Sequence, residues 1–316
     1  MDGTRYLLTG AAGNLGSSIA RQLVSAGKAV RALVLEGDRA AERLPKEVEL
    51  VGGDLSDAAS LRRFFDGAEP GKAICIHCAS IVTVSPAYSR KVYEVNVEGT
   101  RRIVDLCVER GLRKLVYVSS TSAIPEAPGN RLIEEVSDFD PEAVRGFYGQ
   151  TKAEASRIVM EAIQERGLDA SIVFPSGICG PGDYAYGPFS SFIVDYAAGA
   201  MKGGVAGSFN AVDVRDLAAG VIACCERGRR GEGYIMANEL VTMAAMFRLL
   251  SSLTGVPQAK IILPIPAAYA LAALASLAGK LTGAKPRLTS FAVYNLVRNN
   301  NFTSAKAEKE LGYSVR

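Results

Sequence analysis

Apolar and polar positions follow two periodicities that take turns along the first half of the chain. Short, mostly apolar runs are each followed by a longer stretch in which apolar residues recur every three or four positions, and these patterns predict strands and amphipathic helices. The predicted strands are residues 5–9, 29–35, 48–51, 73–78, 114–119 and 170–174, and the predicted helices are about 15–26, 57–66, 87–110 and 141–166. This alternation predicts an α/β fold in which helices cover both faces of a doubly wound parallel sheet.

Beyond the last of these strands, the pattern changes to shorter pieces that are punctuated by Gly and Pro. A helical pattern at 214–228 and a short strand at 234–236 predict that the chain returns to the sheet before it leaves again. We therefore expect residues 1–176 to form the sheet domain, with a return at about 211–239. The rest of 177–316 is expected to form a smaller C-terminal lobe that binds the substrate.

The composition is that of a globular protein with an aliphatic core, because 48% of the 316 residues are hydrophobic and 7% are aromatic. The net charge of +3 is spread along the chain, and the densest basic patch, around Arg229, is flanked by glycines, so we expect no nucleic-acid partner. The six cysteines lie mostly in apolar runs, which favours reduced thiols, and the first residues lack the pattern of a signal peptide. Both features predict a cytoplasmic protein.

Two segments have the residues for other functions. A CxxC motif from Cys75 to Cys78 encloses His77, the only histidine, inside a predicted strand. A zinc site needs further ligands on a loop, so no metal is predicted; a Ser-His-Asp hydrolase is excluded, since no G-x-S-x-G motif occurs. The apolar run 267–279 is shorter than the roughly 20 residues of a membrane-spanning helix, so we expect no stable membrane span. A buried or pocket-covering helix is favoured, and a shallow membrane contact or a dimer surface stays open.

A glycine-rich stretch, Thr9-Gly-Ala-Ala-Gly-Asn-Leu-Gly16, joins the first predicted strand to the first predicted helix. Glycines in such a turn let backbone N–H groups approach a pyrophosphate, and the start of the helix favours its negative charge. Together with the strand and helix pattern around it, the loop predicts a Rossmann-type dinucleotide-binding domain. The cofactor-binding residues expected in it are Gly10, Gly13, Asn14, Leu15 and Gly16.

The choice between NAD and NADP depends on the end of the second predicted strand, Leu35-Glu-Gly-Asp-Arg39. A carboxylate at this place would bind the ribose hydroxyl groups, whereas an arginine would bind the additional phosphate of NADP. Glu36 and Asp38 favour NAD, and Arg39 is the counterargument. We expect NAD or NADP as the cofactor, with NAD favoured.

Tyr148 and Lys152 are four residues apart in a predicted helix and therefore share one helical face. An ammonium group beside a phenol stabilises the phenolate, which lowers the tyrosine pKa from its usual value of about 10. Such a tyrosine can act as a general acid or base for an alcohol or a ketone. The pair alone is weak evidence, because chance gives such a pair in about every second chain of this composition.

Further motifs follow in order along the chain. They are the T-G-x-x-G-x-x-G loop, Gly53-Asp-Leu55, His77-Cys-Ala-Ser80, Asn96-Val-Glu-Gly-Thr100, Val118-Ser-Ser-Thr121, Tyr148-x-x-x-Lys152, Pro175-Ser-Gly-Ile-Cys-Gly-Pro181 and Val212-Asp-Val-Arg-Asp216. This ordered set resembles the extended short-chain dehydrogenase/reductase family, of the NAD-dependent epimerase/dehydratase type, in its branch of dihydroflavonol reductases and 3β-hydroxysteroid dehydrogenases. The resemblance is continuous from Thr4 to Tyr313.

The resemblance implies a role for each matching residue. Tyr148 would donate or accept the proton of the substrate oxygen, and Lys152 would bind the nicotinamide ribose. Thr121 would form a hydrogen bond with the substrate oxygen, with the serines at 120 and 122 as alternatives, and Asn96 would hold a water near the lysine. The other implied cofactor contacts are Glu36, Asp54, Leu55, Ala79, Ser80, Pro175 and Ile178.

The same family contains nucleotide-sugar epimerases and dehydratases, so the lobe has to indicate the substrate. Gly177 stands where those enzymes usually carry an asparagine that holds the diphosphate, and Phe174 replaces an arginine before the proline. The residues expected in the substrate pocket are Ser122, Tyr184, Tyr186 and Phe189. The set favours an NAD(P)-dependent oxidoreductase that interconverts a secondary alcohol and a ketone on a hydrophobic, steroid-, terpenoid- or flavonoid-like substrate. A nucleotide-sugar epimerase or dehydratase and a non-catalytic dinucleotide-sensing protein remain alternatives.

The resemblance also implies a homodimer. Members of this family pair through two long helices, which correspond to about 87–110 and 141–166 in this chain.

Overall fold

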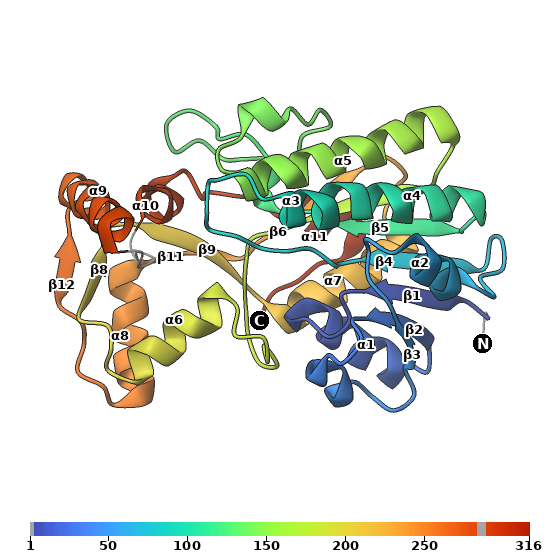
Figure 1. Ribbon diagram of the computed structural model, residues 1–316, viewed down its shortest axis with the longest axis horizontal. Helices are drawn as coiled ribbons and strands as arrows, with labels where there is room; N and C mark the ends of the chain where they lie inside the picture. Colours follow the sequence, from blue (N-terminus) through green and yellow to red (C-terminus); the bar gives the residue numbers. More distant parts are fainter. Residues whose placement is uncertain (1–2, 283–288) are drawn as a thin grey trace.

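The computed structural model describes residues 3–282 and 289–316. Its centre is a seven-stranded sheet in the order β10-β6-β5-β4-β1-β2-β3, in which all neighbouring strands are parallel (Figure 1). The strands are β1 (Arg5–Thr9), β2 (Ala29–Val34), β3 (Glu49–Gly52), β4 (Ala73–His77), β5 (Lys114–Val118), β6 (Ala170–Pro175) and β10 (Gly233–Met236). The predicted Rossmann-type fold is confirmed, and β10 is the predicted return of the chain to the sheet.

Helices cover both faces of this sheet, and each face has its own apolar core. The helices are α1 (Asn14–Ser25) and α7 (Val214–Arg227) on one face, and α2 (Ala58–Phe65), α4 (Gly99–Glu109) and α5 (Phe147–Arg166) on the other. Successive strand residues point to opposite faces, so Leu7 lies in the core beneath α4 and α5, whereas Leu8 lies in the core beneath α1 and α7. Shorter elements are the 3-10 helices η1 (Arg39–Arg43), η3 (Thr121–Ala123) and η4 (Pro141–Ala143), and the helix α11 (Ala305–Leu311).

Both long predicted helices differ in detail from the prediction. The helix expected at 87–110 begins with α3 (Arg90–Tyr93), passes through a π-helical turn, η2 (Glu94–Glu98), and continues as α4. The helix expected at 141–166 begins only at Phe147, because Gly146 has a φ of +88° and separates it from η4. Hydrophobic periodicity could not locate either feature, since the first depends on Asn96 and the second on a single glycine.

The smaller lobe is built after β6 and lies to the left of the sheet in Figure 1. It contains a three-stranded sheet, in the order β11-β9-β7, and a two-stranded sheet of β12 and β8. Its elements are β7 (Gly177–Cys179), α6 (Pro188–Ala197), β8 (Gly203–Val205), β9 (Ser208–Asp213), β11 (Glu239–Thr242), α8 (Met243–Thr254), β12 (Ile261–Leu263), α9 (Ile265–Thr282) and α10 (Ser290–Val297). Two small apolar cores, one around Phe247 and one around Val293, hold the lobe together.

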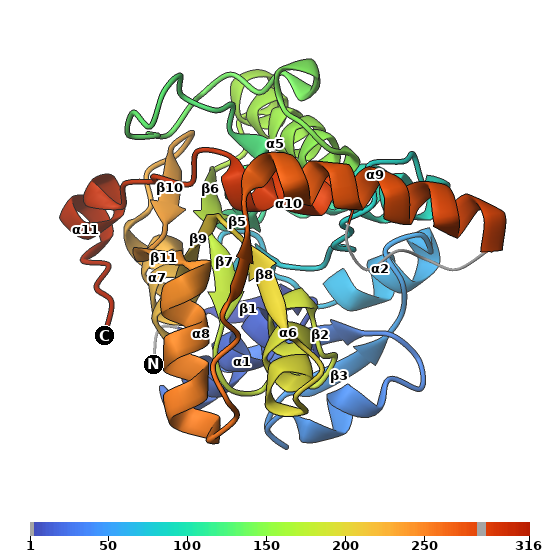
Figure 2. The same cartoon turned by 90° about the vertical axis from the view of Figure 1, so that its left-hand side faces the viewer.

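The apolar run predicted at 267–279 lies in α9, which runs along the outer side of the lobe with α10 beside it (Figure 2). Ala268 packs into the lobe core, whereas Leu271, Leu274 and Leu277 are exposed on another face. In the described ranges, no helix combines the length and the apolar character that a membrane crossing requires.

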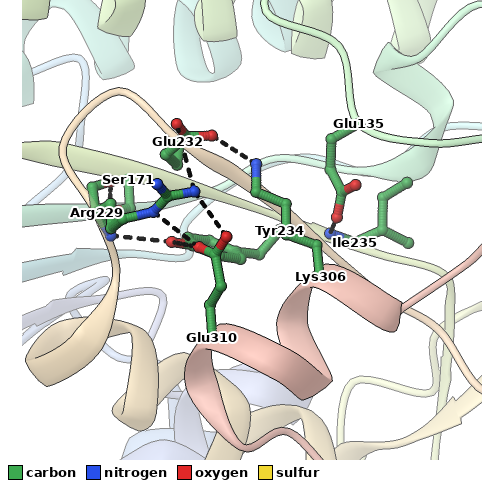
Figure 3. Close-up of polar contacts among 8 residues, drawn as sticks. All are labelled: Glu135, Ser171, Arg229, Glu232, Tyr234, Ile235, Lys306 and Glu310. Atoms are coloured by element: carbon green, nitrogen blue, oxygen red, sulfur yellow. Dashed lines mark hydrogen bonds and ion pairs between the residues drawn. The ribbon is translucent and has the colours of Figure 1, made fainter.

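The outer edge of β10 is closed by side chains from distant parts of the chain (Figure 3). The backbone N of Ile235, which faces away from β6, donates a hydrogen bond of 2.8 Å to Glu135 Oε1. Next to it, Glu310 of α11 accepts hydrogen bonds of 2.9 and 2.6 Å from Arg229 and one of 2.9 Å from Tyr234. This cluster fixes α11 against the edge of the sheet.

Candidate active site

The loop after β1 has the close backbone approach that a dinucleotide site requires. Gly10 has a φ of +70°, and a Cβ at this position would lie 2.8 Å from the backbone N of Ala79. A Cβ at Gly16 would lie 2.1 Å from the carbonyl O of Gly10. Gly13 caps α1, and Asn14 Oδ1 in the first turn is buried without a hydrogen-bond partner among the described residues. The glycines and the start of the helix fit a pyrophosphate at this place, whereas Asn14 Oδ1 is an acceptor and cannot donate to it.

The turn after β2 leaves one carboxylate open for a ribose. Asp38 accepts a hydrogen bond of 2.9 Å from the backbone N of Ala40 and caps η1. Glu36 is exposed and lies against Gly52, while Arg39, the counterargument to NAD, is exposed at the start of η1. Glu36 can therefore accept hydrogen bonds from the ribose hydroxyl groups, which favours NAD.

Two further predicted cofactor contacts, Asp54 and Leu55, follow β3. Asp54 Oδ1 accepts hydrogen bonds of 2.7 Å from the hydroxyl and from the backbone N of Ser56, and these bonds hold the pKa of the carboxyl group below its usual range. Leu55 is buried against Gly99 at the start of α4. Asp54 is thereby oriented as an ionised acceptor at the end of its strand.

A chain of hydrogen bonds connects the glycine-rich loop with β4 and the π-helical turn. The backbone N of Ala79 donates to Thr9 Oγ1 at 3.2 Å, and this hydroxyl lies 2.6 Å from His77 Nδ1. His77 Nε2 lies 3.0 Å from Thr100 Oγ1, which itself donates to the carbonyl O of Asn96 at 2.7 Å. Because each hydroxyl has one proton, Nε2 of the ring carries the proton and Nδ1 accepts. Burial lowers the pKa of His77 to about 3, so the ring stays neutral.

The side chain of Asn96 joins the loop after β4 to the helix that carries Tyr148. Asn96 Oδ1 accepts a hydrogen bond of 2.7 Å from the backbone N of Ile81, and Nδ2 donates to the carbonyl O of Ile81 at 3.0 Å. Nδ2 also donates to Thr151 Oγ1 at 3.1 Å. π-helical turns often occur at functional sites, and here the turn directs this amide toward α5. The implied role of Asn96 in holding a water stays a prediction.

Lys152 is buried behind the site, with 2% of its surface exposed. Its Nζ donates a hydrogen bond of 2.7 Å to the carbonyl O of Val118 and lies 4.6 Å from the centre of the Tyr117 ring. Burial lowers the pKa of Lys152 to about 7. The lysine therefore gains or loses its proton near neutral pH.

Burial raises the pKa of Tyr148 above its usual value, and the hydroxyl groups of Ser120 and Ser80 oppose this shift by hydrogen bonding. Lys152 is not among the groups that shift it, because its ammonium is directed at Val118. The predicted lowering of the tyrosine pKa by the lysine is therefore absent from this structure. Near neutral pH, Tyr148 is a phenol and has a proton to donate.

Tyr148 opens into a cavity of about 260 Å³ between the sheet and the lobe. Thr121 and Ser122, which follow β5, line this cavity together with Tyr148. So does Ser176, which follows β6 and whose Oγ is buried without a hydrogen-bond partner in the described part of the chain. The apolar walls are Val82, Val84, Phe209, Phe291 and Phe302. The structure thus brings the predicted tyrosine and hydroxyl group to one cavity, whose walls also include polar residues such as Asn210, Asn295 and Asn300.

Three predicted pocket residues do not line this cavity. Tyr184 lies beneath the guanidinium group of Arg43, with 3.9 Å between that group and the ring centre, and Tyr186 is 63% exposed. Phe189 packs against Phe209 within a lobe core. Of the implied cofactor contacts, Pro175 ends β6 and Ile178 packs from β7 against the core of the sheet. Of the residues that follow the sixth strand, Ser176 and Gly177 line the cavity, whereas the three predicted aromatic residues do not.

The walls that sequence reasoning missed come from distant segments. Phe291 lies in the first turn of α10 and Phe302 follows the end of this helix, both more than 100 residues after β6. Arg145 and Arg298 line the cavity as well. The sequence could have indicated one of these residues, Arg145, because it stands three residues before Tyr148 and is followed by a glycine. Nothing in the local pattern marks the others.

A model of the NAD dependent epimerase/dehydratase family matches residues 6–237, a segment that contains the glycine-rich loop, Asn96, Tyr148 and Lys152. The chain belongs to this family. The resemblance to the extended short-chain dehydrogenases/reductases is confirmed. This member of the family is an NAD(P)-dependent enzyme.

Relatives of this epimerase/dehydratase family member carry names from lipid and flavonoid chemistry. A protein named sterol demethylase protein B, from Methylococcus capsulatus, is 33% identical over 261 residues, which are 82% of this chain and 77% of the relative. A putative dihydroflavonol 4-reductase from Synechocystis sp. is 29% identical over 313 residues, 97% of this chain and 89% of the relative. The crystal structure of gox2253 is similar with a TM-score of 0.84 at 32% identity, and the alignment covers 99% of this chain and 93% of that one.

Proposed function

We propose that this protein interconverts a secondary alcohol and a ketone on a hydrophobic, steroid-, terpenoid- or flavonoid-like substrate, with NAD(H) as the redox partner. The proposal is carried by the cavity into which Tyr148 and Thr121 both open, since most of the surface of its walls is apolar, although polar residues line it as well. A pocket with apolar walls and a few convergent polar groups suits a hydrophobic molecule with one reacting oxygen. The printed names of the two relatives agree with such a substrate.

Bound NAD would supply the hydride acceptor for oxidation, or the hydride donor for reduction. The loop from Gly10 to Gly16 would hold its pyrophosphate through backbone N–H groups, and Glu36 would hold its ribose. Tyr148 moves the proton at the substrate oxygen, and Thr121 orients that oxygen by a hydrogen bond. In ketone reduction the oxygen gains a proton, so the raised pKa of Tyr148 leaves it in the required phenol form at neutral pH. In alcohol oxidation Tyr148 has to accept a proton, so this direction should be faster at alkaline pH.

Nucleotide-sugar chemistry is the second candidate, and the family description supports it. Gly177, where the sugar-nucleotide enzymes usually carry an asparagine, lines the cavity without a side chain. A Cβ at Gly177 would lie 2.8 Å from the carbonyl O of Asn210, so an asparagine has no room there without a shift of the backbone. This close approach favours the hydrophobic substrate.

Nicotinamide absorbance with a panel of hydroxy- and ketosteroids beside UDP-sugars tests the proposal. We expect NAD-dependent turnover of at least one steroid and none of UDP-glucose. Turnover of a UDP-sugar alone would replace the first candidate by the second. A protein that binds NAD tightly but transforms no compound of either class would instead be a dinucleotide sensor.

We also propose a cytoplasmic homodimer. The exposed positions of α4 and α5, the helices through which the family pairs, are polar or charged, for example Arg101, Asp105, Arg157 and Glu161. The cores of protein interfaces are usually depleted of charge, so such a dimer would be held mainly by ion pairs. Sedimentation at low and at high salt checks this, because ion pairs weaken in salt.

A further inference from the structure

A second cavity, of about 370 Å³, adjoins the one that contains Tyr148. The two cavities have Ser122, Arg145 and Arg298 in common as walls, so these three residues stand at the passage between them. The second cavity does not include Tyr148 or Thr121 in its walls. A molecule whose reacting oxygen lies at Tyr148 could therefore extend past Ser122 into the second cavity.

The guanidinium groups of the two arginines at this passage have no hydrogen-bond acceptor among the described residues, although Arg145 lies over the ring of Tyr294. Within residues 3–282 and 289–316, neither guanidinium group forms an ion pair or a hydrogen bond, and Arg298 Nε is buried without a partner. The segment 283–288, outside the described residues, contains no acidic residue. Arginine side chains keep their charge at any ordinary pH. A buried guanidinium N–H without an acceptor is costly, which suggests that an acceptor comes from a ligand.

The carboxylate that shares a cavity wall with these arginines already accepts hydrogen bonds from other groups. Among the described residues that line either cavity, Glu126 is the only acidic one. Its Oε1 accepts a hydrogen bond from the hydroxyl of Tyr294, and its Oε2 accepts one of 3.2 Å from the backbone N of Asn299. With Glu126 counted against the two arginines, one positive charge at the passage remains uncompensated.

The backbone fixes both arginines relative to Tyr148. Arg145 precedes Gly146, and a Cβ at Gly146 would lie 2.1 Å from Phe291 Cζ, so this turn and α10 are in close contact. Arg298 ends α10, where its backbone N donates to the carbonyl O of Tyr294 at 2.8 Å. The guanidinium carbon of Arg145 lies 5.2 Å from the ring centre of Tyr294. Arg298 is therefore held in the wall of the cavity, whereas Arg145 is exposed and lies over the ring of Tyr294.

We propose that Arg145 and Arg298 form a binding subsite for an oxyanion of the substrate, a carboxylate on an otherwise apolar keto or hydroxy compound, and that the acid group lies in the second cavity. This inference rests on the proposed function. It names the substrate class more closely: a hydrophobic acid, with its reacting oxygen at Tyr148 and its apolar body against Phe209, Phe291 and Phe302. The planar guanidinium group suits a carboxylate because it can donate two parallel hydrogen bonds.

The test compares a 3-oxo steroid acid with its methyl ester, two probes that differ in the charge and in one methyl group. Wild type, Arg298→Gln, Arg298→Lys and Arg145→Gln are measured for kcat/KM with NADH, and the complex with NADH is titrated with both probes to give Kd. The matched control is Arg157→Gln on the outer face of α5, whose partner is Glu161. We expect wild type to prefer the acid by about 10- to 100-fold, as for hydrogen bonds to charged groups. Arg298→Gln should reduce this ratio to near 1 by weakening the acid much more than the ester, while Arg298→Lys restores part of the ratio.

Three results would overturn the subsite. They are equal Kd values of wild type for acid and ester, an equal loss for both probes in Arg298→Gln, or the same change of the ratio in the Arg157→Gln control. In each case, turnover of the ester would leave the proposed function intact. Turnover of UDP-glucose with no binding of either steroid probe would instead reject the proposed function and the inference together. The Kd measurement decides the question even when neither probe is turned over.

Discussion

The polar groups on the cofactor side of the site differ from those on the substrate side in whether they have hydrogen-bond partners within the described part of the protein. On the cofactor side, a closed chain of hydrogen bonds runs from Ala79 through Thr9, His77 and Thr100 to Asn96. On the substrate side, polar atoms of Ser176 and Arg298 are buried without a partner among the described residues. The first arrangement keeps a common cofactor in one geometry. The second leaves binding capacity open, and that is where the identity of the substrate has to be determined.

Of the substitutions that test this difference, Tyr148→Phe should have the largest effect, because Tyr148 is the proposed proton donor and acceptor of the reaction. We expect turnover to fall by about 10²- to 10⁴-fold, the usual contribution of a positioned proton donor, while NADH binding is kept. Steady-state kinetics and titration of NADH fluorescence measure the two effects. Tyr269→Phe, in α9 and away from both cavities, is the matched control. If the Tyr148 variant keeps more than a tenth of the activity, the mechanism is wrong.

Lys152→Met tests the cost of a buried charge on the cofactor side. Below about pH 7 this lysine is protonated in the folded and in the unfolded chain, so the full cost of burying its charge is present. Between about pH 7 and 10.5 the folded chain releases the proton while the unfolded chain keeps it, and the stability of wild type rises relative to the variant. The advantage of Lys152→Met in the free energy of unfolding should therefore shrink from pH 6 to pH 10, by on the order of 4 kcal/mol.

Urea unfolding of both proteins at several pH values gives this difference. Lys309→Met, on the exposed side of α11, is the control and should show no such trend. A difference between wild type and Lys152→Met that is the same at every pH would contradict the lowered pKa of the lysine.

Gly16→Ala tests how tightly the glycine-rich loop is packed. Its Cβ would meet the carbonyl O of Gly10 at 2.1 Å, so the loop has to move; overpacking of this kind costs about 1 to 3 kcal/mol of unfolding free energy. NADH binding should weaken with it. Gly13→Ala, where the same distance is 3.3 Å, should have a smaller effect on both quantities. Equal effects of the two substitutions would show that the close approach at Gly16 is not what matters.

Glu310→Gln should have the smallest effect, since its ion pair with Arg229 lies at the surface, far from both sides of the site. We expect a loss of about 1 kcal/mol or less in the free energy of unfolding, and unchanged kinetics. Glu226→Gln, an exposed residue of α7, is the control. A loss of activity in Glu310→Gln would mean that the edge of the sheet is coupled to the site.

Much of the cofactor side was predictable from sequence, because it depends on residues that are close together in the chain. The six strands, the glycine-rich loop and the pair of Tyr148 and Lys152 all follow from local periodicity or from a fixed spacing. The direction of the lysine was not predictable. Lys152 lies in α5, and its Nζ donates to the carbonyl O of Val118 at the end of β5. No spacing in the sequence could indicate this acceptor.

The substrate side was largely hidden from the sequence. Tyr184 and Phe189 are aromatic and follow the sixth strand, yet one stacks on Arg43 and the other lies in a lobe core. The walls are instead supplied by Phe291 and Phe302, which are brought in by the packing of α10 against the turn at Gly146. Such long-range contacts depend on tertiary packing, which a pattern of apolar residues does not encode.

Glu135 does more than complete a hydrogen bond at β10. An open strand edge is a template on which another chain can add a strand, and Ile235 presents such a donor on the outer side of the sheet. Glu135 reaches it from the segment between β5 and α5, so the sheet is closed at seven strands only after this segment has folded over it. A chain that unfolds locally here would expose its edge to a neighbouring molecule. The yield of refolding should then fall as protein concentration rises, and aggregation, more than lost catalysis, would be the first consequence of losing this one carboxylate.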